Sequence, residues 1–317
     1  MADDGDEATP VTPDEAFAVL GNEARLEIVR ALGEAGGPLG FSELHDRVGV
    51  RDSGQFNYHL DQLVGHFVAK DEDGYRLRRP GRHVVEAILS GAVTATPTVE
   101  RTRVDRTCQY CGAPVEIIWR SGSIELYCSE CPGTYGTRGD VPDLAGDTGY
   151  LGRTPLPPAG LQDRDPADAL DAGWTWGGLE LLAISAGMCP RCSATIDRVV
   201  RVCEDHDTSQ GLCETCDGLK QVRLSVYCTN CIYESGGDFL IHLLAQTPVL
   251  AFLADHGYNP VAPSKGRSIR HLQAVYEEDL ERVEPFRATF TIPADDETLV
   301  LTVDDGLEIV DVERRPA

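Results

Sequence analysis

Hydrophobic residues recur at helical spacing in the N-terminal part of the chain. From Phe41 to Gly49 they occupy the i, i+3 and i+7 positions, which predicts a short amphipathic helix. A second helix is expected from Gly54 to Phe67, with Ser53 or Asp52 accepting a hydrogen bond from a free first-turn N–H. The pair Asp73–Gly74 then suits a tight hairpin turn. Helix, turn, helix and hairpin in this order predict a winged helix-turn-helix.

The C-terminal part follows a different pattern, in which apolar and polar residues alternate. From Phe286 to Ile309 this period of two, with turns at Asp295–Asp296 and Asp305–Gly306, predicts a three-stranded antiparallel meander. An apolar run over residues 238–256 predicts a buried helix, and another helix is expected over residues 269–281. The apolar face of the meander needs such a helix to cover it.

Cysteine pairs dominate the middle of the chain. The first block has Cys108-x2-Cys111 and Cys128-x2-Cys131, separated by alternating runs around Ser121-Gly122-Ser123. A hairpin brings two such pairs to one tetrahedral site, so we interpret this block as a zinc ribbon. Disulfides are the alternative, and the reducing setting expected inside a cell argues against them.

The second block contains four further pairs of candidate ligands. They are Cys189/Cys192, Cys203/His206, Cys213/Cys216 and Cys228/Cys231. Sequential pairing would join the first pair to the second and the third to the fourth. Nested pairing would join the two outer pairs and the two inner pairs. Runs of similar length, Ala194 to Val202 and Leu219 to Tyr227, favour nested pairing because they can pair antiparallel with one zinc at each end.

The twelve candidate ligands form three sets of four, so three zinc ions are expected. Each set fills all four positions of a tetrahedral ion and leaves none for a catalytic water, which predicts structural zinc. Redox or zinc sensing is the alternative, with Cys203 and His206 as its expected place. The sequence contains no recognisable nucleophile–base set, phosphate loop or open metal site, so the chain is not predicted to be an enzyme.

The charge of the chain indicates the kind of environment in which the protein works. The chain has 52 acidic against 28 basic residues, a formal charge of -24, and its only lysines are Lys70, Lys220 and Lys265. A strongly negative surface keeps a protein dispersed in concentrated salt, and this composition resembles that of proteins from halophilic archaea. An ordinary acidic cytosolic protein is the alternative. Since no secretory signal or bilayer-length apolar run is visible, we expect a cytoplasmic protein with no membrane partner.

Against this acidic background, the segment from Phe41 to Arg82 is neutral, with seven basic and seven acidic residues. Its arginines cluster near the return strand of the predicted wing, where DNA phosphates would lie; a solvated run of charge is the usual alternative. The residues expected to contact phosphates are Arg51, Arg76, Arg78, Arg79 and Arg82. The second helix offers groups that suit base edges in a major groove. The residues expected there are Ser53, Gln55, Asn57, Tyr58 and His59.

The run from Leu20 to Leu32, with the helix pair that ends in Asn57-Tyr58-His59-Leu60, resembles the ArsR-like winged-helix transcription regulators of archaea. The resemblance covers roughly the first third of the chain. Metal-sensing members of that family carry cysteines in or before the reading helices, and this segment has none, so metal sensing is not expected there. From Gly187 to Ala317 the chain is similar to the zinc-ribbon C-terminal regions of halophilic archaeal regulators.

The expected fold class is α+β: a winged helix-turn-helix, two zinc ribbons, connecting helices and a small C-terminal antiparallel meander. The expected segments are a disordered acidic arm (1–12), the winged helix-turn-helix (13–93), a linker (94–103), a zinc ribbon (104–153), a connecting helix (165–186), a second ribbon with an inserted zinc knuckle (187–237), and helices plus meander (238–317).

The motifs and the resemblance together imply a sequence-specific DNA-binding transcriptional regulator with structural zinc. The alternative is an interaction module of the basal machinery, similar to archaeal transcription factor E, which would bind polymerase and would not read bases. Expected partners are double-stranded DNA, a protein partner at the C-terminal region, and a second copy of the chain. The helix from Gly81 to Leu89 is the candidate dimer contact, with packing inside its own domain as the alternative.

Overall fold

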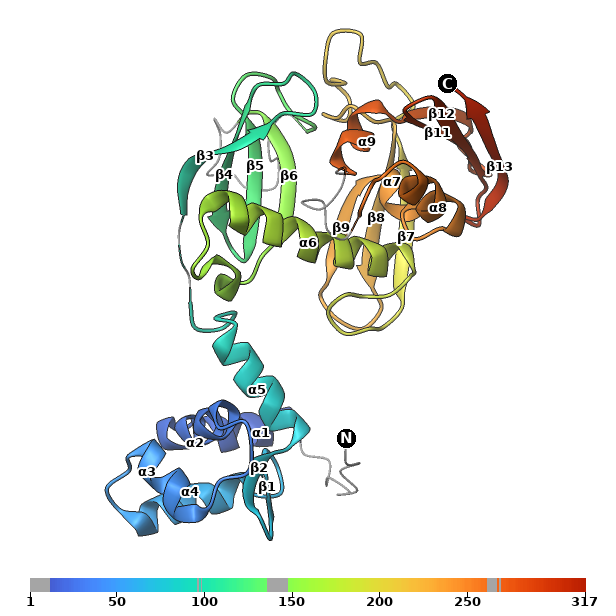
Figure 1. The fold of residues 1–317 in the computed structure, drawn as a ribbon. Coiled ribbons are helices and arrows are strands. Elements are labelled where there is room, and N and C mark those ends of the chain that lie inside the picture. Colours follow the sequence, from blue (N-terminus) through green and yellow to red (C-terminus); the bar gives the residue numbers. More distant parts are fainter. Residues whose placement is uncertain (1–11, 96, 98, 136–147, 261–266, 268) are drawn as a thin grey trace. The chain divides into compact units, whose positions relative to one another are not determined.

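The structure is a computed structural model that describes residues 12–95, 97, 99–135, 148–260, 267 and 269–317 (Figure 1). The chain divides into two compact units, Met1–Ala95 (unit 1) and Thr96–Ala317 (unit 2). Both combine helices with antiparallel sheet, which confirms the α+β class. The predicted acidic arm lies outside the described residues except for Thr12. In the described part of the chain, no helix is both long and apolar enough to cross a bilayer.

Unit 1 packs helices around a short antiparallel hairpin. Its elements are α1 (Pro13–Leu20), α2 (Glu23–Glu34), α3 (Phe41–Val48), α4 (Ser53–Leu63), β1 (Val68–Asp71), β2 (Gly74–Leu77) and α5 (Arg79–Leu89). The core joins α2, α3 and α4 through Ile28, Leu44 and Phe56, whose side chains are fully buried. The helical spacing seen in the sequence therefore places these apolar positions on inward faces.

Helix α4 begins as predicted and ends earlier than predicted. Asp52 is the N-cap, and its side chain accepts a hydrogen bond of 2.8 Å from the backbone N–H of Gln55. The helix was expected to reach Phe67 but stops at Leu63, because Val64 is extended and Gly65 turns the chain with φ of 86°. A left-handed turn of this kind suits glycine, and it directs the chain into β1.

The hairpin turn lies one residue before the expected position. Asp71 pairs with Gly74, so Glu72 and Asp73 form the turn and Gly74 begins β2. Gly74 has φ of 127°, and a Cβ there would lie 2.5 Å from the carbonyl oxygen of Leu39. The glycine is therefore required where the segment before α3 crosses the hairpin.

Unit 2 begins with a four-stranded antiparallel sheet, here called the first sheet. Its strands are β3 (Val99–Thr107), β4 (Pro114–Arg120), β5 (Ser123–Cys128) and β6 (Tyr150–Pro155), in that order. The predicted linker over residues 94–103 is thus partly wrong, because β3 starts at Val99 and pairs with β4. Strand β6 lies beyond the two runs that the cysteine spacing predicted, and it pairs with β5.

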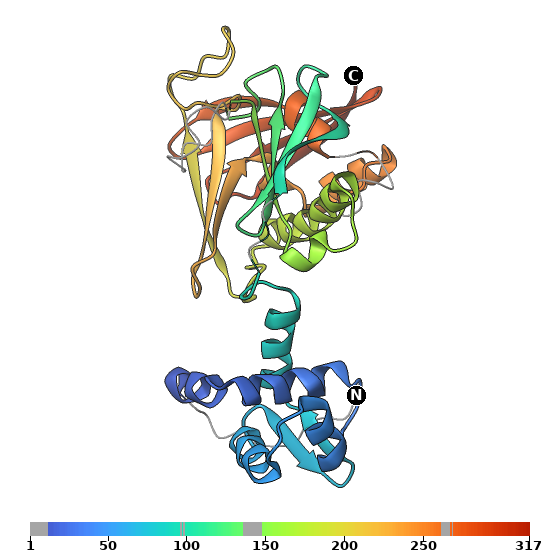
Figure 2. The ribbon, with the colours of Figure 1, turned by 90° about the vertical axis from the view of Figure 1, so that its left-hand side faces the viewer.

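The long helix α6 (Pro166–Ser185) follows the short 3₁₀ helix η2 (Pro158–Leu161) and packs on one face of the first sheet (Figure 2). Asp165 caps it by accepting hydrogen bonds from Ala167 and Asp168. Gly177 lets the helix approach β6 closely, since a Cβ at this position would lie 2.5 Å from Thr154 Oγ1. The predicted connecting helix over residues 165–186 is therefore confirmed, and it is part of the core.

The rest of unit 2 contains two further antiparallel sheets and short helices (Figure 1). The second sheet has β7 (Ile196–Val202), β8 (Val222–Cys228) and β9 (Glu234–Asp238). The helices are α7 (Leu240–Leu243), α8 (Thr247–Asp255) and α9 (Arg270–Val275). The third sheet has β10 (Glu277–Arg282), β11 (Arg287–Ala294), β12 (Glu297–Val303) and β13 (Ile309–Pro316). One core joins them, with Phe239 and Phe290 stacked at 4.4 Å between ring centroids.

Two predictions about this region are corrected. The single helix expected over residues 238–256 is divided into α7 and α8, with Pro248 in the first turn of α8, because proline cannot continue a helix through its missing N–H. The meander has four strands, since β10 replaces the end of the helix expected over residues 269–281. Exposure alternates along β10, and pairing with β11 satisfies its backbone.

Candidate metal centres and nucleic-acid interface

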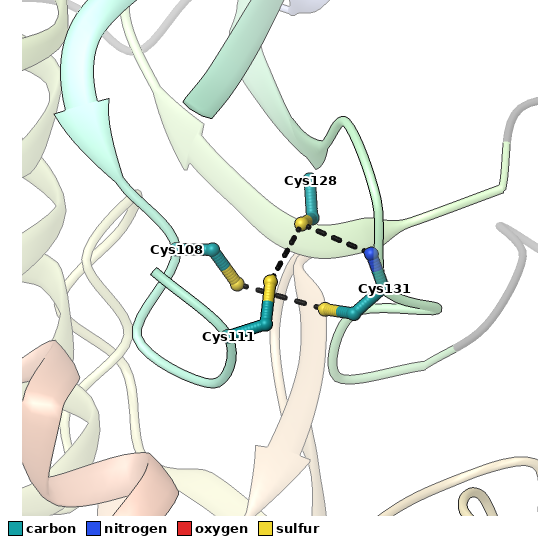
Figure 3. A group of neighbouring side chains, drawn as sticks. All are labelled: Cys108, Cys111, Cys128 and Cys131. Carbon is teal, nitrogen blue, oxygen red and sulfur yellow. Dashed lines mark hydrogen bonds between the residues drawn. The ribbon is translucent and has the colours of Figure 1, made fainter. Parts of the chain in front are cut away.

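The first site consists of Cys108, Cys111, Cys128 and Cys131, whose side chains converge between two chain turns (Figure 3). One turn lies between β3 and β4, and the other follows β5. The Sγ atoms of Cys108 and Cys131 are 3.7 Å apart, and those of Cys111 and Cys128 are 3.5 Å apart. The pairing of β4 with β5 brings the two turns to the same end of the sheet.

This spacing fits a bound metal ion and does not fit a disulfide. A zinc ion with Zn–S bonds of about 2.3 Å places its sulfur ligands about 3.8 Å apart in a tetrahedron. A disulfide would need sulfurs about 2.05 Å apart. All eleven cysteines are free, so the first site is a set of four converging thiols that could hold zinc.

The second block forms two more sets, and they are nested. The outer site has Cys189 and Cys192 with Cys228 and Cys231, and the inner site has Cys203 and His206 with Cys213 and Cys216. Within each of the three sets the ligand atoms all lie within 4.8 Å of one another. The nested pairing predicted from the strand-like runs is therefore confirmed.

The register of β7 and β8 explains the nested arrangement. Ile196 pairs with Cys228 at one end of the hairpin, and Val202 pairs with Val222 at the other. The outer site is thus held at the first end, and the segment carrying the inner site extends beyond the second (Figure 1). Here Cys216 Sγ lies 3.4 Å from His206 Nδ1.

One backbone turn recurs at the first cysteine of three pairs. In the first site, Cys108 N–H donates to Ala113 O and Gly112 N–H donates to Cys108 O. The outer site repeats these bonds around Cys189, and the inner site repeats them around Cys213. The residue after the second cysteine is left-handed in each turn; these residues are Gly112 (φ 76°), Ser193 (φ 60°) and Asp217 (φ 49°). The recurrence indicates one local structure used three times.

Backbone N–H groups also point at the sulfurs. Cys128 Sγ accepts from Glu130 and Cys131, and Cys228 Sγ accepts from Asn230 and Cys231, at distances of 3.3–3.4 Å. The bonds from Cys231 and Asn230 lower the pKa of the Cys228 thiol to about 6. Thiolate is the form that binds metal, so this turn prepares the Cys228 sulfur as a ligand. A tetrahedral ion held by four protein donors would have no open coordination position.

The residues predicted to contact bases lie on α4, and they divide between its two faces. Ser53, Gln55, Asn57 and Tyr58 are exposed, with Tyr58 at 58%. His59 is only 8% exposed and belongs to the inward face of the helix. A buried imidazole does not reach a base edge, so the candidate base contacts are restricted to the exposed residues.

The arginines predicted to contact phosphates differ in their exposure and in their partners within the protein. Arg51, Arg79 and Arg82 are exposed. Arg76 Nε lies 2.9 Å from Asp71 Oδ2 in a cross-strand ion pair, and Arg78 donates to the carbonyl oxygen of Gly65. The hairpin supports both of these arginines internally, so the exposed three are the better candidates for a phosphate.

A buried polar cluster that was not predicted from the sequence lies between the second and third sheets. Asp238 is 2% exposed, and its carboxylate is near Glu278, Lys220, Arg223 and Tyr135. Glu278 accepts hydrogen bonds from the backbone N–H of Gln221 and Val222, and Lys220 Nζ donates to Tyr276 O. The only sequence signal was an acid beside an apolar run, which is too common to identify a site.

Two family models match the chain, and both describe domains of unknown function. Domain of unknown function (DUF7347) matches residues 13–88, within unit 1. Domain of unknown function (DUF7351) matches residues 105–309, within unit 2. No curated protein and no solved structure matches the chain. The boundary between the two matches falls where the chain divides into its compact units.

Proposed function

We propose that this chain, which belongs to the DUF7351 family through a match over more than half of its length, is a sequence-specific DNA-binding transcriptional regulator. Unit 1 would be the winged helix-turn-helix and α4 its recognition helix. The observation that carries the proposal is the division of α4 into two faces. Phe56 and Leu60 are fully buried, whereas Gln55, Asn57 and Tyr58 are exposed.

The exposed groups suit direct reading of a major groove. The side-chain amide of Gln55 can pair with an adenine edge, and the ring of Tyr58 can contact a thymine methyl group. Asn57 Nδ2 donates to Asp61 Oδ2 at 2.9 Å, so Asn57 would have to exchange this bond for a base. Gln55 and Tyr58 are therefore the primary base contacts in this proposal, and Asn57 is secondary.

The phosphate contacts in this proposal come from exposed arginines of unit 1. Arg51 precedes the Asp52 cap, and Arg79 and Arg82 lie in the first turn of α5. Contacts of this kind fix the register of a protein on the duplex without reading its sequence. Unit 2 would carry three structural zinc ions, in the first, outer and inner sites, and would present a surface to a partner or signal.

A second candidate is an interaction module of the basal machinery that resembles archaeal transcription factor E and does not read bases. The tip of the hairpin favours it, because Asp71, Glu72 and Asp73 are exposed there. Carboxylates at a wing tip repel phosphates, whereas a basic protein surface would attract them.

Selection of native chromosomal DNA fragments by the full zinc-loaded chain tests the proposal. Selected fragments are expected to bind about a thousandfold more tightly than random DNA. Tyr58→Ala and Gln55→Ala are expected to reduce this ratio about tenfold each, because each removes a base contact. Arg79→Gln is expected to weaken binding to all sequences equally. Arg30→Gln is the matched control, since Arg30 lies on α2 in ion pairs with Glu27 and Glu34. Equal affinity for selected and random DNA would exclude the regulator and favour the second candidate.

A further inference from the structure

Unit 2 contains a cavity of about 300 Å³ at the point where three of its elements meet. It is lined by residues of β6 in the first sheet, of the start of β9 in the second sheet, and of α6. The start of α9 closes a further side with Ile269 and Arg270. We refer to this space as the inter-sheet cavity.

The cavity follows from the way α6 connects two cores. The first half of the helix packs in the core of the first sheet through Leu170, and its last turn packs in the larger core through Ile184. Strands β6 and β9 are edge strands of separate sheets and do not pair with each other. One helix therefore covers two sheet edges that do not meet, and a space is left between them.

The ionisable groups around the cavity have an excess of positive charge. Arg153, Arg191 and Arg270 line it, against Glu180 and Glu234. Arg191 is committed to Glu180, with Nη1 and Oε1 2.6 Å apart. In the described part of the chain, Arg153 is exposed and has no ion-pair partner. A positive cavity in a chain with a formal charge of -24 selects an anion.

Aromatic and aliphatic side chains form the remaining walls. They are Trp174, Tyr233, Leu181, Ile184, Pro155, Pro260 and Ile269. The guanidinium carbons of Arg270 and Arg106 lie 5.7 and 5.9 Å from the centroid of the Trp174 ring. These two contacts hold the indole in place as part of the wall. A few polar groups set into a mainly apolar cavity are typical of a small-molecule site.

We propose that the inter-sheet cavity binds a small organic carboxylate with an aromatic or branched apolar body. The carboxylate would face Arg270 and Arg153, and the body would lie between Trp174, Tyr233 and Leu181. The volume limits the ligand to roughly fifteen non-hydrogen atoms. This inference is independent of the proposed function, because it concerns binding within unit 2 and does not require DNA.

Three probes with the same ring and different charge test the ligand class. Phenylacetate, 2-phenylethanol and 2-phenylethylamine are titrated calorimetrically into the full zinc-loaded chain, and the branched 4-methylpentanoate is a second acid. At least one of the acids is expected to bind at least tenfold more tightly than the alcohol, and the amine is expected not to bind. Absence of binding by both acids up to about 10 mM, or equal binding of alcohol and acid, overturns the proposal.

Variants of the chain locate the binding. Arg153→Gln and Arg270→Gln are each expected to weaken acid binding about tenfold, since each removes a charged hydrogen-bond donor. Leu181→Trp is expected to abolish binding by filling the cavity. Arg103→Gln is the matched control, because Arg103 is an exposed arginine on β3 that does not line the cavity.

Tryptophan fluorescence distinguishes binding in the inter-sheet cavity from binding elsewhere on the chain. Tryptophan emission is expected to change on acid binding in the native chain and in Trp176→Phe, and not in Trp174→Phe. If Leu181→Trp or Arg270→Gln fails to fold, the exposed Arg153→Gln still decides whether charge at this cavity matters. Unchanged affinity in Arg153→Gln together with an unchanged signal in Trp174→Phe would place the acid elsewhere and overturn the assignment.

Discussion

The Sγ atoms of Cys192 and Cys228 lie 3.4 Å apart, although the two cysteines are 36 positions apart in the chain. The strand pair β7–β8 brings them together, and Cys189 and Cys231 complete the set. The spacing of these four thiols fits a shared metal ion and does not fit a disulfide. An ion bound there would link the two ends of the second sheet's hairpin connections and help to hold that sheet together.

The purified chain is expected to carry three zinc ions. Their removal by a chelator should unfold unit 2, because each ion links turns that are distant in sequence, whereas unit 1 has no cysteine and should keep its helices. Elemental analysis measures the ion content, and circular dichroism with limited proteolysis follows the two units. One ion or none per chain would contradict the structural role of the three sites.

The inner and outer sites are expected to differ in their effect on stability. Cys189 belongs to the large core of unit 2, whereas Cys213 lies in the segment that extends beyond β7 and β8. Cys189→Ser should lower the free energy of unfolding by several kcal/mol. Cys213→Ser should remove one zinc ion and lower the free energy of unfolding much less. Thermal unfolding in excess zinc compares the two. Equal destabilisation would show that the inner site also supports the core.

Burial of Asp238 predicts a pH-dependent stability. Burial, together with the negative charge of Glu278, raises the pKa of Asp238 from 3.8 to about 6, while Lys220 and Arg223 oppose the shift. A raised folded-state pKa stabilises the fold below the unfolded value of 3.8, and this stabilisation is lost as the pH rises through about 6. At pH 7.5 the ionised carboxylate therefore costs on the order of 3 kcal/mol of folding free energy.

Asp238→Asn is accordingly expected to raise the free energy of unfolding at pH 7.5 and to lose this advantage progressively as the pH falls from about 6 towards 3.8. Denaturant titrations across this range, with zinc in excess, measure the difference. Asp279→Asn is the matched control, since Asp279 is exposed on β10. A difference that does not change with pH would mean that Asp238 keeps one protonation state across the range.

Gly177→Ala is expected to destabilise unit 2. The new Cβ would lie 2.5 Å from Thr154 Oγ1, and Thr154 is buried and donates to Gly173 O, so neither side can move freely. Forced overpacking of this kind costs ~1–3 kcal/mol. In the double variant with Thr154→Ala the two losses should not add, because the clash is removed. Additive losses would show that α6 shifts to accept the methyl group.

The proposed DNA complex is expected to tolerate concentrated salt. Ordinary protein–DNA complexes weaken steeply as salt rises, because the entropy gained by releasing counterions from the DNA becomes smaller. At about 1 M salt the screening length is about 3 Å, so repulsion between DNA and a chain with a charge of -24 is already suppressed. Affinity for a selected fragment should therefore change less than tenfold between about 1 M and 3 M KCl. Fluorescence anisotropy measures this, and a steep fall would exclude binding by close contacts alone.

The sequence alone determined the features whose physics is local. Asp52 can cap α4 because the side chain and the N–H that it accepts from are three residues apart. The metal ligands are likewise recognisable because each pair and its backbone turn lie within a few residues. The inward spacing of Phe56 and Leu60 followed from helical periodicity in the same way.

Tertiary structure decided everything that depended on partners distant in the chain. Spacing allowed sequential and nested metal sites and the lengths of the strand-like runs favoured the nested one, but it is the register of β7 on β8 that fixes it. Residues 277–282 became a strand because β11 offers them a hydrogen-bonding edge, which no local pattern records. The burial of His59 and Asp238, and the cavity between β6 and β9, also arise where separate elements pack. Their environment is set by residues far away in sequence, so only the folded chain defines it.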